Sequence, residues 1–275
     1  MPDMLAKGVR WFDDWFSIQQ IDEGLWAIGE PRFHQINWNY LVAGNARALL
    51  FDTGPGVRDI SVVVKALTNL PVTALPSHMH FDHTGNLHRF DDLAMADLPQ
   101  LRIHEKDGLM QEPGDLFLGH FEGMAWRAVA VRHWWPIGHI IELGGRQLEI
   151  LDTPGHAAEH VALWDHAHNI LLAADFLYLG ALWGQTRGAN LADYERVTEA
   201  LLQRMDGATQ IFGAHGQANE RDQHAAPKLA KQDAEDLLKT LKSLKKSGEM
   251  PGRVEVNKRM YLLTAPHAFA AWQKP

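Results

Sequence analysis

Short apolar runs separated by turn residues fill the first fifty positions of the chain, and this spacing predicts a series of β-strands. Gly24 and the pair Gly44-Asn45 lie between the runs and have the chemistry of tight turns. The predicted strands cover residues 16–21, 25–28, 38–43 and 46–51. The N-terminal part of the protein is therefore expected to be a sheet of hairpin-connected strands.

Helical and extended patterns alternate along the rest of the chain. Residues 57–70 and 193–205 are predicted to be helices, the first ended by Pro71 and the second beginning near Asp193. The lysine-rich stretch 228–246 carries leucines near helical spacing, which predicts an amphipathic helix with a solvated charged face. Further strands are predicted at 72–75, 137–143, 147–151, 161–164, 170–174 and 260–263, and residues 84–135 are expected to mix helix and loop.

The composition narrows the classes of protein that the chain can belong to. The 275 residues contain no repeat, low-complexity tract or linker, so a single domain spanning 1–275 is predicted. The net charge of -8 disfavours nucleic acid as a partner, and a small-molecule substrate is expected. Cysteine is absent, which excludes disulfides and thiolate metal sites. The sequence shows neither a signal peptide nor an apolar run long enough to span a membrane, so a cytoplasmic location is predicted.

Potential metal-ligand side chains are most concentrated in the segment His78-Met79-His80-Phe81-Asp82-His83. Imidazole and carboxylate groups are ligands for zinc and similar divalent ions, and no packing rule requires such a cluster. The segment follows the predicted strand 72–75, at the strand end where α/β folds carry their chemistry. In an extended strand His83 would point away from the other ligands, so we expect the segment to curl.

Three further strands each end in one ligand-type residue beside small residues. His156 follows Thr153-Pro154-Gly155, Asp175 follows the apolar run 170–174, and His215 follows Gly213-Ala214. Small residues allow the backbone to approach a bound ion closely. These residues are the expected partners of the histidine cluster.

The order and spacing of these motifs resemble the metallo-β-lactamase-fold hydrolase superfamily. The resemblance covers about Trp26 to Gly216 and includes Asp52-Thr53-Gly54, which is similar to an early turn of that superfamily. It implies an αββα sandwich of two mixed β-sheets with helices on the outer faces. It also implies two metal ions: His78, His80 and His156 would hold one, Asp82, His83 and His215 the other, and Asp175 would bridge them. The superfamily usually has glycine before the bridging aspartate, where this chain has Ala174.

Several other residues are expected to act around the ligands. Asp52 and His160 are predicted to orient ligand side chains from behind. Tyr178 follows Asp175 by three positions, a spacing similar to that of acyl-homoserine lactonases, where a tyrosine hydroxyl assists at the substrate carbonyl. Packing in the core is an equally good interpretation of this tyrosine. The aromatic and imidazole side chains expected to line the substrate cleft are Phe33, His34, Trp38 and Trp183.

The predicted activity is hydrolysis of a carboxylic ester-type bond by a hydroxide shared between two divalent metals. Zinc is expected because imidazole suits it, although carboxylate ligands also admit manganese or iron. Asp82 is a candidate to return the proton to the leaving group. A lactone or other ester ranks first because of Tyr178, followed by a thioester, as in glyoxalase II, and then by a β-lactam. A mononuclear iron oxygenase on the same fold is less favoured, because all ligands for two metals are retained. The oligomeric state is left open.

Overall fold

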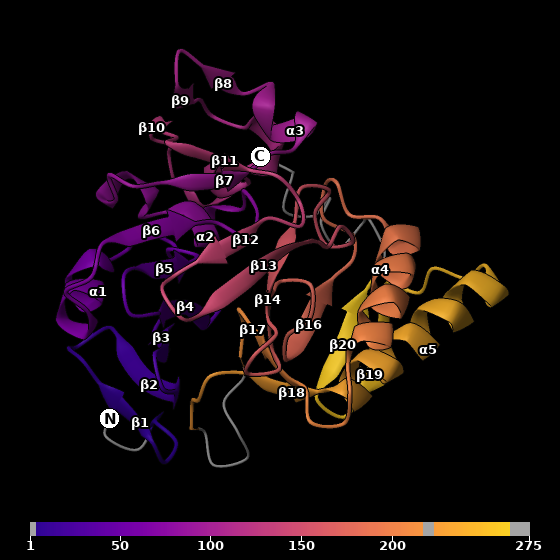
Figure 1. Ribbon diagram of the computed structural model, residues 1–275. Coiled ribbons are helices and arrows are strands. Elements are labelled where there is room, and N and C mark those ends of the chain that lie inside the picture. Colours follow the sequence, from indigo (N-terminus) through magenta and orange to yellow (C-terminus); the bar gives the residue numbers. More distant parts are fainter. Residues whose placement is uncertain (1–3, 217–222, 265–275) are drawn as a thin grey trace.

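The protein, described here from a computed structural model over residues 4–216 and 223–264, is built on two six-stranded sheets (Figure 1). In spatial order, the first sheet contains β1 (Val9–Trp11), β2 (Ser17–Asp22), β3 (Leu25–Glu30), β4 (Asn37–Ala43), β5 (Ala48–Phe51) and β6 (Val72–Leu75). The second contains β12 (Ile140–Glu142), β13 (Gln147–Asp152), β14 (Val161–Asp165), β15 (Ile170–Ala174), β17 (Gln210–Gly213) and β18 (Lys228–Ala230). Each sheet has one parallel pair, β5 with β6 and β15 with β17, and is otherwise antiparallel. Both sheets are therefore mixed, as predicted.

Alternation of apolar side chains along the central strands creates three core layers. In β5, Leu49 and Phe51 face the second sheet, whereas Ala48 and Leu50 pack on the other side with helix α1 (Ser61–Leu67). In β15, Leu172 belongs to the layer between the sheets, and Leu171 packs outward. Strands buried on both faces need apolar residues at successive positions, which is what these runs supply. Burial of the inner layer holds the two sheets face to face.

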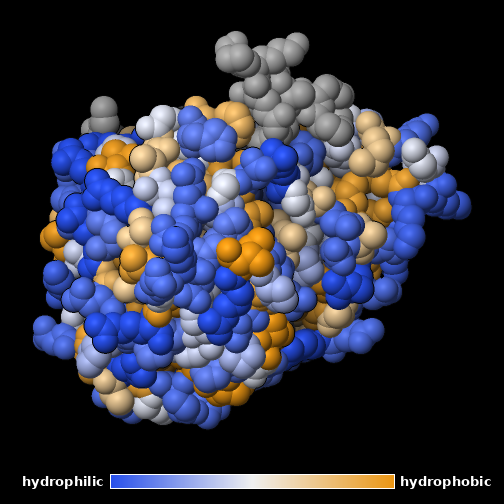
Figure 2. Space-filling model, turned by 90° about the horizontal axis from the view of Figure 1, so that it is seen from above, coloured by the Kyte–Doolittle hydropathy of each residue, from blue (hydrophilic) through white to orange (hydrophobic). Residues whose placement is uncertain are grey.

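Helices cover the two outer faces (Figure 1). Helix α1 lies on the first sheet, and α4 (Leu191–Arg204) and α5 (Lys231–Ser247) lie side by side on the second. The apolar stripe of α5 includes Leu237, Leu241 and Leu244. Its lysines from Lys239 onward are exposed, whereas Lys231 is half-buried and donates to the Met205 carbonyl oxygen at 3.0 Å. This arrangement confirms the predicted αββα sandwich. Figure 2 shows a mostly hydrophilic surface on the face seen from above, with apolar side chains in separate small groups. No helix in the described ranges has the length and hydropathy needed to cross a bilayer.

Smaller elements lie between and beside the two sheets. A third sheet combines β16 (Gly180–Trp183), β20 (Met260–Leu263) and β19 (Arg253–Asn257). The segment between β6 and β12 contains paired strands β7 (Ala94–Ala96) and β11 (His133–Trp135), together with β8 (Glu105–Lys106), β9 (Leu109–Met110) and β10 (Val129–Ala130). Its helices are α2 (Phe81–Thr84), α3 (Pro99–Arg102) and the 3₁₀ turns η2 (Leu87–Arg89), η3 (Gly114–Leu116) and η4 (Gly119–Glu122).

Two differences from the sequence prediction have clear physical causes. Helix α1 is shorter than the expected 57–70, because the Asp59 carboxylate accepts the Ser61 backbone N–H at 3.0 Å and Thr68 is extended. Short polar side chains that bond to nearby backbone groups compete with helix formation in this way. Strands β16 and β19 were not predicted. Both are short, and β16 pairs with the distant β20, whereas β19 forms a hairpin with β20.

Candidate dinuclear metal centre

The histidine-rich segment leaves β6 and curls, as its spacing requires. Residues 77–80 form bends, and Phe81–Thr84 form the one-turn helix α2. This turn brings Asp82 and His83 to the same side as the histidines that precede them, and all four ligand-type side chains are buried. Most of the candidate ligands therefore come from one compact segment at the end of the first sheet.

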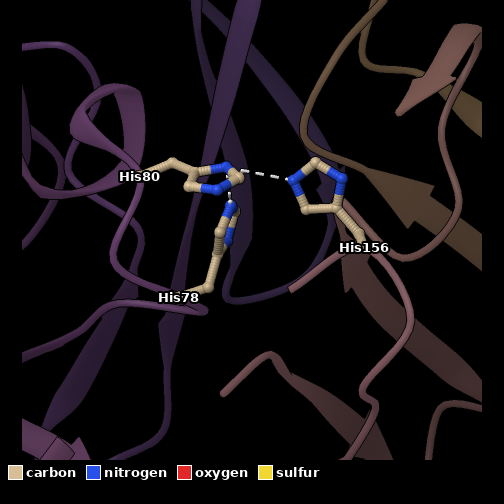
Figure 3. Close-up of side chains that lie close together, drawn as sticks. All are labelled: His78, His80 and His156. Atoms are coloured by element: carbon tan, nitrogen blue, oxygen red, sulfur yellow. Dashed lines mark hydrogen bonds between the residues drawn. The ribbon is translucent and has the colours of Figure 1, made fainter. Parts of the chain in front are cut away.

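Three imidazoles converge on one point (Figure 3). The Nδ1 atom of His80 lies 2.9 Å from Nε2 of His78 and 3.0 Å from Nε2 of His156. The other ring nitrogen of His78 contacts the Ser77 hydroxyl at 2.9 Å, and that of His156 donates to the Trp183 carbonyl oxygen at 2.9 Å. These contacts leave one lone pair of each ring directed at the shared point, which is the geometry of a three-histidine metal site.

A second group lies beside the first and is connected to it by Asp175. The Oδ2 atom of Asp82 is 3.4 Å from Nε2 of His83 and 3.3 Å from Nε2 of His215. Asp175 lies 3.3 Å from His83 and 3.1 Å from His215, and its other oxygen lies 3.4 Å from His156. The structure thus brings together all seven predicted ligands, with Asp175 between the two groups.

Asp52 supports the second group from behind. It adopts a left-handed backbone conformation (φ 65°) directly after β5, and its carboxylate accepts the Ser77 backbone N–H at 2.6 Å. Its Oδ2 atom accepts the Nδ1–H of His83 at 2.9 Å. This bond leaves Nε2 of His83 to face Asp82 and Asp175. A carboxylate behind a ligand imidazole fixes its tautomer and orientation.

His160 lies behind the bridging aspartate. Its Nε2 atom accepts the Asp175 backbone N–H at 3.2 Å, so the ring proton must be on Nδ1, which contacts the Thr153 hydroxyl at 2.8 Å. The Asp175 backbone is held in place after Ala174, which has a left-handed conformation (φ 42°) at a β-bulge. Glycine adopts that conformation without the steric cost that a Cβ atom imposes.

Replacing Ala174 by glycine is expected to raise the free energy of unfolding by about 0.5–1 kcal/mol. The gain is the relief of a left-handed alanine, reduced by the extra freedom of glycine in the unfolded chain. Chemical denaturation measures it. The neighbouring Ala173→Gly is the control, because Ala173 is equally buried and has ordinary backbone angles, so that variant should lose stability. Equal losses in both variants would contradict the strain at Ala174.

Burial and charge divide the imidazoles into two kinds. Burial, together with the neighbouring rings, lowers the pKa of His78 far below its usual range, lowers that of His80 to about 3 and lowers that of His156. The second group behaves in the opposite way. Burial opposes protonation there, but nearby carboxylates outweigh it, raising the pKa of His83 well above its ordinary value and that of His215 to about 10. Without a metal, the first group is neutral at pH 7 and the second carries protons in place of cations.

The donor set fits two divalent cations. Nε2 of His83 and Oδ1 of Asp175 are buried and have no hydrogen-bond partner among the described residues. Buried polar atoms without a partner are costly, and a metal bond would satisfy them. Neutral imidazoles and two carboxylates are the ligands that zinc prefers, and the same carboxylates admit manganese or iron. The seven side chains can therefore hold one cation in each group.

A cavity of about 330 Å³ opens above the ligands. Its walls are mainly apolar and aromatic, and they include Ile36, Phe81, Leu118, Phe121, Tyr178, Leu179, Ala181, Trp183 and Tyr261. Of the expected cleft residues, His34 and Trp183 line this cavity. The prediction was wrong for the other two. The side chain of Trp38 points from β4 into the core between the sheets and is 1% exposed. Phe33 packs against Phe81 and Phe117 and does not line the cavity.

Tyr178 lines the cavity, but its hydroxyl is engaged with the backbone. It donates to the Ala181 carbonyl oxygen and accepts the Trp183 N–H at 3.3 Å. Burial and the Asp175 charge raise its pKa well above the ordinary value, so the phenol keeps its proton. Because that single proton is directed at Ala181, the hydroxyl can donate to a substrate only by giving up this bond.

Sequence reasoning missed several residues that hold the ligands. Ser77 contacts both Asp52 and His78, and the Asn37 side chain donates to Asp82 Oδ2 at 3.1 Å. The buried Glu159 accepts the Met79 backbone N–H at 3.2 Å. Ser77 could have been found from its position beside the motif. Asn37 and Glu159 are brought close only by the packing of distant segments, and no local pattern marks them.

An αββα sandwich with two adjoining His/Asp ligand groups at the strand ends defines a class of metal-dependent hydrolases. Residues 33–247 match the profile of the metallo-beta-lactamase superfamily, and the chain belongs to this superfamily.

Relatives and solved structures are consistent with this membership. The chain is 27% identical to "Acyl-coenzyme A thioesterase MBLAC2" of Gallus gallus, over 70% of this chain and 77% of the relative. It is also 27% identical to a hydroxyacylglutathione hydrolase of Bradyrhizobium sp., over 46% of this chain and 40% of the relative. Among solved structures, a metallo-beta-lactamase from Pontibacter korlensis has the same fold, with a TM-score of 0.61, 20% identity, and coverage of 82% of this chain and 99% of the other.

Proposed function

We propose that this protein is a dinuclear metal hydrolase that cleaves an acyl thioester. The observation that carries the proposal is the pair of ligand groups joined by Asp175 at the base of a mainly apolar cavity. Such walls suit the acyl part of a substrate and leave the polar carbonyl beside the ligands. Similarity to an acyl-coenzyme A thioesterase and to a hydroxyacylglutathione hydrolase supports a thioester over other ester-type bonds.

Each side chain has a defined part in the proposed chemistry. His78, His80 and His156 would hold one cation, Asp82, His83 and His215 the other, and Asp175 would contact both. Two divalent cations, with zinc favoured by the imidazoles, would supply an activated water and a Lewis acid for the carbonyl oxygen. Asp82 is the candidate to return a proton to the leaving group. Leu118, Phe121 and Trp183 would exclude bulk water from around the acyl group.

Lactone hydrolysis is the second candidate, and Tyr178 is the residue that favours it. If the Tyr178 hydroxyl turns toward a substrate carbonyl, Tyr178→Phe should lower kcat for a lactone by roughly 10-fold to 10³-fold. If it stays on Ala181, the variant should lose about 1 kcal/mol in free energy of unfolding and keep kcat within about threefold of wild type. Because the hydroxyl is bonded to the backbone, we expect the second result.

Steady-state kinetics with one lactone and one thioester, together with thermal melting, distinguishes the two results. Tyr261→Phe is a suitable control, because Tyr261 also lines the cavity but lies on β20, in the third sheet. A large loss confined to Tyr178→Phe, seen with the lactone and absent with the thioester, would reverse the ranking of the two substrates.

The whole proposal is tested by metal analysis and a substrate panel. Protein purified without chelator should contain two equivalents of metal and should hydrolyse acyl thioesters, of coenzyme A or of glutathione, with higher kcat/KM than lactones or β-lactams. A firm value of one equivalent would contradict a dinuclear centre and would reopen the mononuclear oxygenase alternative. Two equivalents with activity only on lactones or β-lactams would keep the hydrolase and reject the thioesterase.

A further inference from the structure

Glu159 is a buried acidic residue outside the set of predicted ligands. It lies in the loop between His156 and His160, and only 1% of its surface is exposed. Its Oε1 atom accepts the backbone N–H of Met79 at 3.2 Å. Its Oε2 atom is buried and has no hydrogen-bond partner among the residues that the structure describes. Burying a carboxyl group is costly, so its single long-range contact calls for an explanation.

Met79 is the residue between the ligands His78 and His80, and both of its neighbours point their rings at the same site. The direction of the Met79 N–H is fixed by the same backbone torsions that aim these two side chains. A buried N–H needs a partner, and at this position the partner is the carboxyl group of Glu159. The contact therefore limits how the backbone of the ligand segment can turn.

His80 depends on this backbone contact more than the other ligand histidines do. The second ring nitrogens of His78 and His156 contact the Ser77 hydroxyl and the Trp183 carbonyl oxygen. Those of His83 and His215 contact Asp52 and the Gln35 carbonyl oxygen. Within residues 4–216 and 223–264, His80 has ring hydrogen-bond contacts only to the two other histidines of its group. Its orientation must therefore come from its backbone.

Glu159 also joins the two loops that supply the first ligand group. It lies three residues after His156, and its carboxyl group reaches the loop that carries His78 and His80. This bond joins the source of one ligand to the source of the other two, beside the hydrogen bond that the Val161 N–H donates to the Ser77 carbonyl oxygen at 2.8 Å. Partners behind metal ligands commonly act in this way, although usually through a ligand side chain rather than through the backbone between two ligands.

We propose that Glu159 is a positioning residue that fixes the backbone between His78 and His80 and thereby sets the geometry of the three-histidine site. Its role is that of a hydrogen-bond acceptor and not that of a charge. Burial raises its pKa, and the carbonyl oxygen of a neutral acid accepts the Met79 N–H as a carboxylate does. An amide oxygen at the same place should serve as well. This inference rests on the proposed metal centre.

The test compares Glu159→Gln, Glu159→Asp and Glu159→Ala in the full chain. Zinc affinity is measured by competition with a chromophoric chelator, and the thermal stability of each metal-free protein is measured separately. Glu159→Gln should bind zinc within about threefold of wild type, because the acceptor is retained. Glu159→Ala should bind roughly 10-fold to 100-fold more weakly, the usual loss for a residue that orients a ligand. Glu159→Asp, whose side chain is too short to reach Met79, should resemble Glu159→Ala.

A merely structural role predicts a different pattern. In that case Glu159→Ala would lower the melting temperature of the metal-free protein and leave zinc affinity within threefold of wild type, which would overturn the proposal. If Glu159→Ala fails to fold, the comparison of the aspartate and glutamine variants decides, and equal affinities would overturn it. Failure of the wild type to bind zinc, manganese or iron would instead reject the metal centre itself, so the two failures are distinguishable.

Discussion

Replacing His80 by alanine is expected to reduce hydrolysis of any substrate of this protein by at least roughly 10³-fold, because it removes a ligand on which the nucleophile depends. His80 Nδ1 lies at the centre of the three-histidine group, so its loss leaves only two imidazoles in that group. The fold should survive, because the two sheets are held together by apolar packing. Initial rates and circular dichroism spectra of the purified variant provide the measurement.

The matched control for that substitution is His104→Ala. His104 belongs to neither ligand group and lies outside the residues that line the cavity. Its removal should leave metal content and kcat close to wild type. Near-normal turnover by His80→Ala after treatment with a chelator would refute the assignment of the metal site.

In the metal-free protein, the free energy of unfolding should depend steeply on pH below about 6.5. The pKa values of His78, His80, His156 and His160 are lowered in the fold, burial being the largest cause. A group with a lowered folded pKa that is neutral in the fold contributes stability above its unfolded pKa of about 6.5 and loses it as the pH falls. Each such imidazole contributes up to about 1.4 kcal/mol per pH unit below that point.

His83 and His215 act in the opposite direction in the metal-free protein. Their pKa values are raised, so their contribution is complete below about pH 6.5 and is lost as the pH rises toward the folded pKa, about 10 for His215. Stability should therefore be greatest near pH 6.5–7. Melting temperatures of chelator-treated protein between pH 5 and 9 measure this profile. In His80→Gln, the slope of stability against pH below about 6.5 should be smaller by the contribution of one imidazole. Wild-type stability that does not change with pH in this range would contradict the assignment of neutral, buried histidines.

Much of the site could be predicted from the sequence, because its ligands lie in one dense motif and at the ends of apolar runs. The cluster from His78 to His83 and the single ligands at His156, Asp175 and His215 each follow a strand, and such strand ends meet at one edge of the sandwich. The fold followed from the same runs, because strands buried on both faces are apolar at successive positions. Asp52 also lies where it was expected, behind His83.

The cleft was harder to predict, because side chains that line a cavity are selected by packing between distant segments. Phe33 lies in the loop between β3 and β4, and it packs against Phe81 and Phe117. Trp38 lies in β4, and the pleat of that strand turns it into the core. Of the apolar wall from the third sheet, Trp183 was predicted, but Ala181 and Tyr261 were missed, since β16 is short and pairs with β20 about 80 residues away. Glu159 and Asn37 depend on similar long-range contacts. The cytoplasmic location and the single-domain boundaries stay predictions.

The distribution of candidate ligands between the two sheets would make any cation bound by either group a cross-link between the halves of the chain. The segment after β6 of the first sheet supplies two ligands to each group, and the loops of the second half supply His156 to one, His215 to the other and Asp175 to both. Neither half could hold a cation with its full ligand set by itself. Metal affinity and the docking of the two sheets must therefore be coupled, so that any change that loosens the inner apolar layer also weakens metal retention, even when it lies far from every ligand.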